Sequence, residues 1–528
     1  MIRIDGLGLS YASASRPVFE HVTFSIGAGE LVLVIGPSGG GKSTLLRCLN
    51  GLVPHFHGGR FAGRVLVDGR DTREQQPRDL ATFVGMVFQD PESQVVAETV
   101  EDELAFGMEN LGLSTQAMCK RVEEAMDLLR IAPIRRRRMD TLSGGELQRV
   151  AIAAVLTMQP RVLLLDEPTS QLDPQAAEEL LTTVQRLHDD LGLTVLIAEH
   201  RLERVAQHAD RVLFVPGDGS VRALDVHEAM ATLPFAPPVA RLGRALAWSP
   251  VPLSVREGRR FVDGRSWPVP ARNGASARGE VAVSVRDLRV SYGGAPALRG
   301  VSLEARAGEV LALMGRNGAG KTTLLRALIG LVGAERGDAF VLGEDVRERA
   351  TEELAREVAF VPQEPASVLH KQTAEEEIAD VLAGTGRAGS IDEALDEWEL
   401  QALRSAHPAD LSAGERQRAA LAAMLVGRPR VILLDEPTRG MDYETKERLV
   451  ANLRQRCRDG AAAVIASHDV ELAARCADRV ALLSDGEVVV EGPVRHVLTE
   501  TLTFSTQVNK LLGGRFLTPE DVLGEAGR

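Results

Sequence analysis

The 528-residue chain lacks any run of apolar residues long enough to cross a membrane as a helix. Its longest apolar run extends from Ala419 to Val426, whereas a membrane-spanning helix needs about 20 residues. The N-terminus, Met1 to Asp5, carries an acidic residue early and has no apolar segment of the signal-peptide kind. We therefore expect a protein without a membrane-spanning part of its own that stays in the cytoplasm.

Cysteine and lysine are also scarce. The cysteines are Cys48, Cys119, Cys457 and Cys476. No two of them form a C-x-x-C pair, which argues against a zinc site or a disulfide scaffold. The lysines are Lys42, Lys120, Lys321, Lys371, Lys446 and Lys510, among 61 basic residues. In a chain that uses arginine as its habitual cation, a retained lysine indicates a position that arginine cannot fill.

Charge and length narrow the class of protein further. The chain has 74 acidic residues against 61 basic ones and a net charge of −13, which argues against binding nucleic acid through its overall field. A hydrophobic content of 44% with 26% charged residues is typical of a soluble globular protein. A chain of this length exceeds what one hydrophobic core supports, so two or more domains are expected.

The sequence contains an internal repeat. Gly36 to Ser43 (GPSGGGKS) recurs as Gly315 to Thr322 (GRNGAGKT). Further landmarks repeat in the same order: Gln89 with Gln363, Ser143 with Ser412, Asp166 with Asp435 and His200 with His468. The proline-rich stretch between the copies contains Pro234, Pro237, Pro238, Pro250, Pro252, Pro268 and Pro270. We therefore predict a first domain over 1–225, a linker over 226–280, a second domain over 281–500 and a C-terminal tail over 501–528.

The repeated glycine-rich segment has the context of a phosphate-binding P-loop. An apolar strand is expected over 30–35, the glycines follow, and apolar residues at helical spacing begin after Lys42. Glycines let successive backbone N–H groups surround phosphates, and the helix N-terminus favours anions. Lys42 is expected to reach the β- and γ-phosphates of ATP, and Ser43 to bind Mg²⁺. A chance glycine-rich turn does not explain two such copies. The predicted residues are Gly36, Pro37, Ser38, Gly39, Gly40, Gly41, Lys42, Ser43 and Thr44, and then Gly315, Arg316, Asn317, Gly318, Ala319, Gly320, Lys321, Thr322 and Thr323.

An acidic pair ends a second buried strand in each half. Asp166 and Glu167 follow Val162 to Leu165, and Asp435 and Glu436 follow the equivalent run. This pattern places carboxylates at the carboxyl edge of a sheet, where ligands of such sheets bind. We expect the aspartate to hold Mg²⁺, and the glutamate to orient and deprotonate the attacking water. Alternatively, the acidic pair only marks the start of a helix. The P-loop upstream favours the functional interpretation.

The segment that points to a family is Leu142 to Arg149 (LSGGELQR), with its second copy at Leu411 to Arg418. Serine followed three residues later by glutamate also predicts a capping box at a helix start. Together with the P-loop and the acidic pair, the segment resembles the signature of ATP-binding-cassette (ABC) ATPases. The resemblance implies an α/β fold with two P-loop ABC nucleotide-binding domains in tandem. Each would have a mainly parallel sheet core, an antiparallel β subdomain and a helical signature subdomain.

The resemblance also implies how the ATP sites are composed, because paired cassettes of this family face each other head to tail. The two cassettes would pair within the chain. The first site would join Lys42, Ser43, Gln89, Asp166, Glu167 and His200 to Ser412 and Gly414. The second would join Lys321, Thr322, Gln363, Asp435, Glu436 and His468 to Ser143 and Gly145. The implied Mg²⁺ ligands are Ser43, Gln89, Asp166, Thr322, Gln363 and Asp435.

Two further residue types acquire roles through the resemblance. His200 and His468 each end an apolar strand, where a histidine is commonly structural, but the family position implies a catalytic hydrogen bond to the γ-phosphate. Tyr11 and Tyr292 precede the P-loop strands, where the family stacks an aromatic ring on adenine; core packing is the alternative. Ala413 replaces the usual second residue of the signature, a glycine.

One region resembles a particular branch of the family. Phe88 to Val96, followed by Thr99 to Leu113, is similar to the coupling region of energy-coupling factor (ECF) importers of vitamins and metal ions, and Ala198 to Leu202 fits the same group. The implied partners are integral membrane subunits, one transmembrane coupling component and one substrate-binding component. The chain would be a peripheral protein on the cytoplasmic side of the cell membrane. The region after Gln363 lacks the second glutamine of the pattern, which predicts a different membrane helix for the second half.

Three alternatives remain in view. Fused monosaccharide importers also carry two cassettes, but usually with one degraded site, which is not evident here. Soluble ABC translation factors that bind the ribosome would show a long charged helical linker for ribosomal RNA, whereas this linker is rich in proline. A DNA-repair protein of the family would need zinc-type cysteine clusters. The sequence favours an importer ATPase of ECF type.

Overall fold

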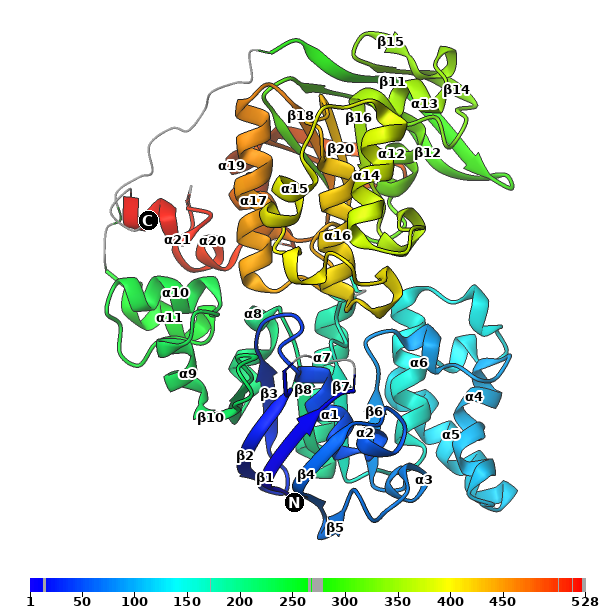
Figure 1. Cartoon of the computed structure of the whole chain (residues 1–528), viewed down its shortest axis with the longest axis vertical. Coiled ribbons are helices and arrows are strands. Elements are labelled where there is room, and N and C mark those ends of the chain that lie inside the picture. The colour runs from blue at the N-terminus through cyan, green and yellow to red at the C-terminus, as the bar shows by residue number, and fades with distance from the viewer. Residues whose placement is uncertain are drawn as a thin grey trace. The chain divides into compact units, whose positions relative to one another are not determined.

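The computed structural model describes residues 1–12, 16–170, 172–264, 267, 279–501, 503–514 and 516–524. It consists of two compact units (Figure 1). Unit 1 comprises Met1–Ala240 and Ser249–Ser254, and unit 2 comprises Arg241–Trp248 and Val255–Arg528. Among the described residues, none of the helices is both long and apolar enough to cross a membrane.

Unit 1 is built around a six-stranded sheet with the order β10-β9-β3-β8-β7-β6. The pairs within β9-β3-β8-β7-β6 are parallel, and β10 pairs antiparallel with β9. The inner strands are continuous apolar runs because both of their faces are buried. The six strands are β3 (Leu31–Ile35), β6 (Val84–Val87), β7 (Val162–Asp166), β8 (Thr194–Ala198), β9 (Arg211–Phe214) and β10 (Arg222–Asp225).

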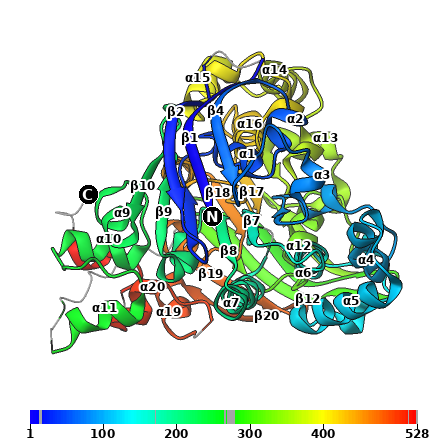
Figure 2. The same cartoon turned by 90° about the horizontal axis from the view of Figure 1, so that it is seen from below.

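A second, antiparallel sheet in unit 1 has the order β2-β1-β4-β5, and its three long strands run side by side in Figure 2. Its strands are β1 (Ile2–Ser10), β2 (Phe19–Ile26), β4 (Arg60–Val67) and β5 (Arg70–Asp71). The helices α4, α5 and α6 pack on one another as a separate group (Figure 1). The helices of this unit up to residue 205 are α1 (Lys42–Leu49), α2 (Leu52–His55), α3 (Pro77–Leu80), α4 (Val100–Asn110), α5 (Thr115–Leu129), α6 (Gly144–Leu156), α7 (Pro174–Leu191) and α8 (Leu202–Val205).

Unit 2 repeats this architecture. Its six-stranded sheet has the order β16-β17-β18-β13-β19-β20, and its antiparallel sheet the order β12-β11-β14-β15. The strands are β11 (Val281–Tyr292), β12 (Ala295–Arg306), β13 (Val310–Met314), β14 (Arg336–Val341), β15 (Glu344–Asp345), β16 (Val358–Val361), β17 (Val431–Asp435), β18 (Ala462–Ala466), β19 (Arg479–Ser484) and β20 (Glu487–Pro493). The helices are α12 (Lys321–Leu328), α13 (Thr351–Glu357), α14 (Ala374–Thr385), α15 (Ile391–Glu397), α16 (Ala413–Leu425), α17 (Tyr443–Arg458), α18 (Val470–Cys476) and α19 (Val494–Thr499). The predicted tandem α/β fold is confirmed.

The segment predicted as a linker contains helices that pack on the two units. Over its described residues it forms α9 (Val226–Thr232), α10 (Pro238–Ala245) and α11 (Val255–Val262). In unit 1, α9 contacts β9 and β10. In unit 2, α11 contacts a helix of the C-terminal tail, α20 (Gln507–Leu512), and the Trp248 ring stacks on Phe261 with centroids 5.0 Å apart. Pro268 and Pro270 lie outside the described residues.

The C-terminal tail also folds, as α20 (Gln507–Leu512) and α21 (Pro519–Leu523). Arg241 connects the linker segment to this tail within unit 2. Its Nη2 donates to Glu520 Oε1 at 2.8 Å, and its guanidinium lies 5.2 Å from the ring centroid of Tyr443. Burial raises the pKa of the Tyr443 hydroxyl to about 12. Both segments thus contribute packed structure to unit 2.

Candidate functional site

The first P-loop connects β3 to α1 and has the backbone of a phosphate cradle. Gly36 has φ 158°, and a Cβ there would lie 2.0 Å from the Val215 carbonyl oxygen, so no larger residue fits. Gly41 begins α1 with φ 106° and no side-chain cap. The N–H groups of the first turn are therefore not taken by a capping side chain, which suits an anion. Lys42 is buried, and its Nζ donates to the carbonyls of Gly36 and Pro37 at 3.0 and 2.9 Å.

The second P-loop connects β13 to α12 in the same way. A Cβ on Gly315, which has φ 150°, would lie 2.3 Å from the Leu483 carbonyl oxygen. Gly320 begins α12 with φ 102°, again without a side-chain cap. Lys321 Nζ donates to the carbonyls of Gly315 and Arg316 at 2.8 and 3.1 Å. Both lysines are thus held across their own loop, at the start of the helix that would receive the phosphates.

Asp166 and Asp435 end the central strands β7 and β17 and are 2% and 1% exposed. The Asp166 Oδ1 and both carboxyl oxygens of Asp435 are buried without a hydrogen-bond partner among the described residues. Burial raises the pKa of each carboxyl to about 6. The Ser43 side chain acts in the opposite direction to burial and lowers the pKa of the Asp166 carboxyl. Buried carboxylate oxygens without donors, beside a hydroxyl, fit the oxygen ligand set of a hard divalent cation such as Mg²⁺.

The next residue in each half has an unusual backbone conformation. Glu167 has φ 48° and Glu436 has φ 47°, in the left-handed region that non-glycine residues rarely adopt. Their N–H groups donate to the carbonyls of Ala198 and Ala466 at 2.9 and 2.8 Å, which fixes the chain as it leaves the sheet. Such strain costs of order 1–3 kcal/mol and is typical of functional positions.

In unit 1 the Glu167 carboxylate meets two other predicted site residues. His200 Nε2 lies 3.0 Å from Oε1, and Gln89 Nε2 donates to Oε2 at 2.9 Å. The carboxylate is buried, which alone would raise its pKa. The charges of His200 and Lys42 and the bond from Gln89 outweigh burial and hold the pKa of Glu167 below its ordinary value. The first half therefore brings the predicted lysine, glutamine, acidic pair and histidine together.

In unit 2 the equivalent residues meet differently. His468 Nδ1 lies 2.9 Å from Glu436 Oε2, and Lys321 Nζ lies 3.9 Å from Oε1. Gln363 is exposed and, among the described residues, has no hydrogen bond to Glu436. The second half thus assembles its lysine, acidic pair and histidine, whereas its glutamine is not joined to them.

The two signature segments begin helices, as the capping-box pattern predicts. Ser143 caps α6 and Ser412 caps α16, and in both cases a reciprocal bond to the glutamate three residues on is present. Gly145 and Gly414 lie in the first turns of these helices. The predicted capping boxes are confirmed.

The two tyrosines differ in their surroundings. The Tyr11 hydroxyl lies 3.3 Å from Thr44 Oγ1 in the first P-loop helix, and burial raises the pKa of this hydroxyl. Tyr292 ends β11 and is 48% exposed. Tyr11 therefore contacts the helix that follows the first P-loop, whereas Tyr292 is about half exposed.

Sequence reasoning missed one buried acid beside the first site. Glu199 immediately precedes His200 and is 3% exposed; the run Ala198 to Leu202 contains it and fits the ECF group, but the sequence assigns no role to this acid. An ionisable residue between an apolar strand and the histidine is the signal that could have pointed to it.

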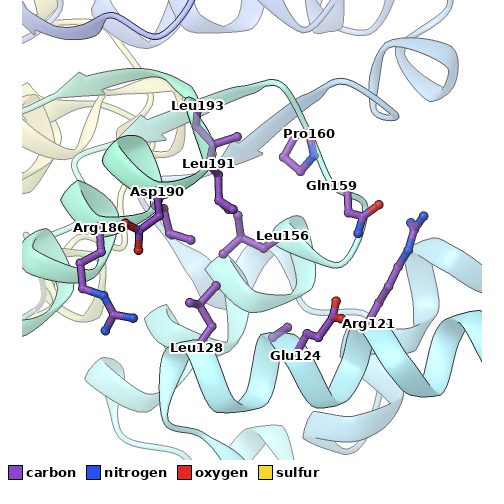
Figure 3. Close-up of a pocket in the computed structure, with 12 residues that line it drawn as sticks. Arg121, Glu124, Leu128, Leu156, Gln159, Pro160, Arg186, Asp190, Leu191 and Leu193 are labelled. Atoms are coloured by element: carbon purple, nitrogen blue, oxygen red, sulfur yellow. The ribbon is translucent and has the colours of Figure 1, made fainter.

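A separate hollow of about 440 Å³ lies in unit 1 between α5, the end of α6 and the end of α7. Figure 3 shows leucine side chains, including Leu128 and Leu156, gathered between Arg121 and Arg186. No residue predicted to bind ATP lines it. The candidate chemistry therefore concentrates at the P-loops.

The P-loops, the acidic pairs and the signature helices define the class as a P-loop nucleoside triphosphate hydrolase with two complete sets of motifs. Comparison with known proteins narrows the class. A family model described as "ABC transporter" matches residues 19–170 and 298–439. A protein of Streptomyces avermitilis named as an ABC transporter ATP-binding protein is 47% identical over 97% of both chains. One of Methanosarcina mazei, named likewise, is 36% identical over 94% of this chain and 90% of its own. The chain belongs to the ABC transporter family and is an ATPase.

Solved structures that share the tandem fold include the following. An RNase-L inhibitor aligns over 93% of this chain and 91% of its own, with a TM-score of 0.60 and 21% identity. At that level of identity the likeness concerns the fold alone.

Proposed function

We propose that this chain is the energy-coupling ATPase of an ABC importer of ECF type, which powers uptake of a vitamin or metal ion through separate membrane subunits. The observation that carries the proposal is the exposure of three large apolar side chains on the segment that resembles the ECF coupling region. Val96, Phe106 and Leu111 on this segment are 64%, 39% and 43% exposed. Exposed large apolar side chains grouped on one segment favour docking of an apolar partner.

Two polar residues hold this segment in shape. Gln94 donates to the Met86 carbonyl at 3.0 Å and accepts from the Phe88 N–H, which ties the turn after β6 back to the strand. Glu103 is buried and accepts from the N–H groups of Val96 and Ala97 at 3.0 and 2.7 Å. The exposed segment is thus held in shape by its own polar network, and a surface held in shape loses less entropy when it binds.

The second half offers a different surface. Over 364–385, all of which is described, no large apolar side chain reaches comparable exposure. This segment also lacks an equivalent of Gln94. We propose that the two halves receive different helices of an asymmetric transmembrane subunit, as the sequence predicts.

The proposed chemistry follows from the site residues of each half. Lys42 and Lys321 would bind the β- and γ-phosphates, with the N–H groups of α1 and α12 around them. Asp166 with Ser43, and Asp435 with Thr322, would hold Mg²⁺, which neutralises phosphate charge when it is bound. Glu167 and Glu436 would orient the attacking water and accept its proton, and His200 and His468 would hydrogen-bond to the γ-phosphate. As in the family, the signature residues Ser143, Gly145, Ser412 and Gly414 would complete the site of the opposite half.

The energy of ATP would be coupled to movement through this arrangement. A signature helix offers N–H groups to the γ-phosphate, so ATP would hold the two halves together more strongly than ADP does. Closure on ATP and opening after hydrolysis would then drive the membrane subunits through the coupling segment. This role places the protein at the cytoplasmic side of the cell membrane as a peripheral component.

The test is capture of the membrane partner from detergent-solubilised membranes with a tagged chain, followed by mass spectrometry. We expect the wild type to retain an integral membrane protein, and Val96→Asp with Phe106→Asp to lose it while ATP hydrolysis in solution is kept. Val489→Asp serves as the control, because Val489 is 68% exposed but lies on β20 of the other unit. Recovery of ribosomal RNA, of a sugar permease, or of the same partner with the double variant would contradict the proposal.

A further inference from the structure

The residue that precedes the histidine differs between the two halves. It is Glu199 in the first half and Ser467 in the second, at the ends of β8 and β18. Both are buried, with 3% and 1% of their surface exposed. A buried glutamate and a buried serine at equivalent positions beside a proposed catalytic carboxylate are not interchangeable. The glutamate is a long acceptor, whereas the serine hydroxyl is short and both donates and accepts.

In the first half Glu199 binds the backbone around the histidine. Its Oε2 accepts from the N–H groups of His200 and Arg201 at 3.1 and 3.3 Å. Its Oε1 accepts from the N–H of Thr169 at 3.1 Å and from the Thr169 hydroxyl. Glu199 thus links the segment after the acidic pair to the histidine backbone.

In the second half the serine is too short to make this link. Thr438, the equivalent of Thr169, is buried, and its hydroxyl has no hydrogen-bond partner among the described residues. The Ser467 hydroxyl instead donates to Glu436 Oε2 at 3.3 Å. The N–H of His468 donates to the same oxygen, also at 3.3 Å. The backbone N–H of the histidine therefore serves Glu199 in one half and the proposed catalytic carboxylate in the other.

This difference changes what holds each proposed base. Glu167 is held by the side chains of His200 and Gln89, both of which are assigned to the nucleotide and its metal. When these side chains turn to the nucleotide, Glu167 becomes available to water. Glu436 also accepts hydrogen bonds from the Ser467 hydroxyl and from the backbone N–H of His468, at the end of β18. Neither of these two donors is assigned to the nucleotide.

We infer that the residue before the histidine makes the two ATP sites unequal: Ser467 restrains Glu436 and slows hydrolysis in the second half, and Glu199 is a positioning residue that keeps Glu167 unrestrained in the first. The inference rests on the proposed roles of Glu167 and Glu436. It assigns Glu199 and Ser467 an effect on the chemical step and none on ATP binding.

The experiment measures one site at a time in the full chain. In a Glu167→Gln background only the second half keeps its base, and Ser467→Ala is expected to raise kcat roughly two- to tenfold, the equivalent of one neutral hydrogen bond, with KM for ATP unchanged. Ser467→Thr retains a hydroxyl and should keep the low kcat. Ser284→Ala is the matched control, because Ser284 is a buried serine of the same unit whose hydroxyl has no partner among the described residues. A structural role alone would not separate kcat from KM in this way.

The reciprocal change completes the test. In a Glu436→Gln background, Glu199→Ser is expected to lower kcat by a similar factor. If Ser467→Ala leaves kcat unchanged, or lowers it together with thermal stability, the inference is overturned. If instead the Glu167→Gln, Glu436→Gln double variant still hydrolyses ATP near the wild-type rate, the assignment of the bases fails, which is a failure of the proposed function and is distinguishable from the first outcome.

Discussion

The two halves share one fold and one set of motifs, yet they hold the proposed catalytic glutamate differently. In unit 1, Glu167 contacts His200 through Nε2 and also accepts from Gln89. In unit 2, Glu436 lies beside His468 Nδ1 and accepts from Ser467, and Gln363 is not joined to it. The P-loops of the two halves make equivalent contacts, because each lysine donates to two equivalent carbonyls of its own loop. The two halves therefore agree in their P-loops and differ in the surroundings of the proposed base.

The largest expected effect tests what the halves have in common. Changing both glutamates, Glu167→Gln with Glu436→Gln, should lower ATP hydrolysis roughly 10²–10⁴-fold, because proton transfer to a positioned base contributes about that much. ATP binding should persist, since both lysines and both loops are intact. Phosphate release at saturating ATP and equilibrium nucleotide binding measure the two quantities.

The single variants, Glu167→Gln and Glu436→Gln, compare the ATP hydrolysis of the two halves. Glu167→Gln alone should remove more activity than Glu436→Gln alone if the first half is the faster site. A control with Glu74→Gln and Glu352→Gln, both exposed glutamates, should behave as the wild type. Hydrolysis close to wild type in the Glu167→Gln, Glu436→Gln double variant would contradict the role assigned to the two glutamates.

The parts of the fold that sequence predicted are those fixed by local pattern. The strand, glycine loop and helix around Lys42 follow from an apolar run that ends in glycine, and the caps at Ser143 and Ser412 follow from a serine and a glutamate at fixed spacing. The helices α10, α11, α20 and α21 were not predicted. They lie in proline-rich or terminal sequence, and long-range contacts such as Trp248 with Phe261 stabilise them. Local sequence pattern therefore predicts the P-loop and the helix caps well, and it predicts helices that depend on long-range contacts poorly.

A smaller effect is expected at the tyrosines, where the halves also differ. Tyr11→Ala should raise the KM for ATP about fivefold, because a stacked aromatic contributes about 1 kcal/mol and Tyr11 is joined to Thr44 in the P-loop helix. Tyr292→Ala should change KM less, since this ring is 48% exposed. Tyr11→Phe keeps the ring and serves as the control. A Tyr11→Ala variant that loses thermal stability but keeps its KM would assign the ring to core packing.

The motifs do not predict the inequality that we propose for the two ATP sites. The positions of Glu199 and Ser467 in the sequence are equivalent, but their partners depend on where the ends of β8 and β18 lie relative to the acidic pair. A glutamate spans the distance to Thr169, whereas the serine hydroxyl bonds to Glu436 and to the N–H of Asp469. Which hydrogen bond forms is therefore a matter of tertiary geometry and side-chain length, and a motif records neither.

The smallest expected effect concerns a feature in which the halves are alike. Ser143→Ala and Ser412→Ala each remove an N-cap and break a capping box, which costs about 1 kcal/mol. For units of this size that corresponds to a lower melting temperature by about 2–4 °C in the affected unit, measured by calorimetry without nucleotide so that any role in ATP binding does not contribute. Ser143→Asn and Ser412→Asn keep a capping side chain and should lose less. Both halves have a capping box, but only Ser143 also donates its hydroxyl to the glutamate, with Oγ 2.9 Å from Glu146 Oε2. The loss for Ser143→Ala should therefore be at least as large as that for Ser412→Ala, and a clearly larger loss for Ser412→Ala would contradict this account of the caps.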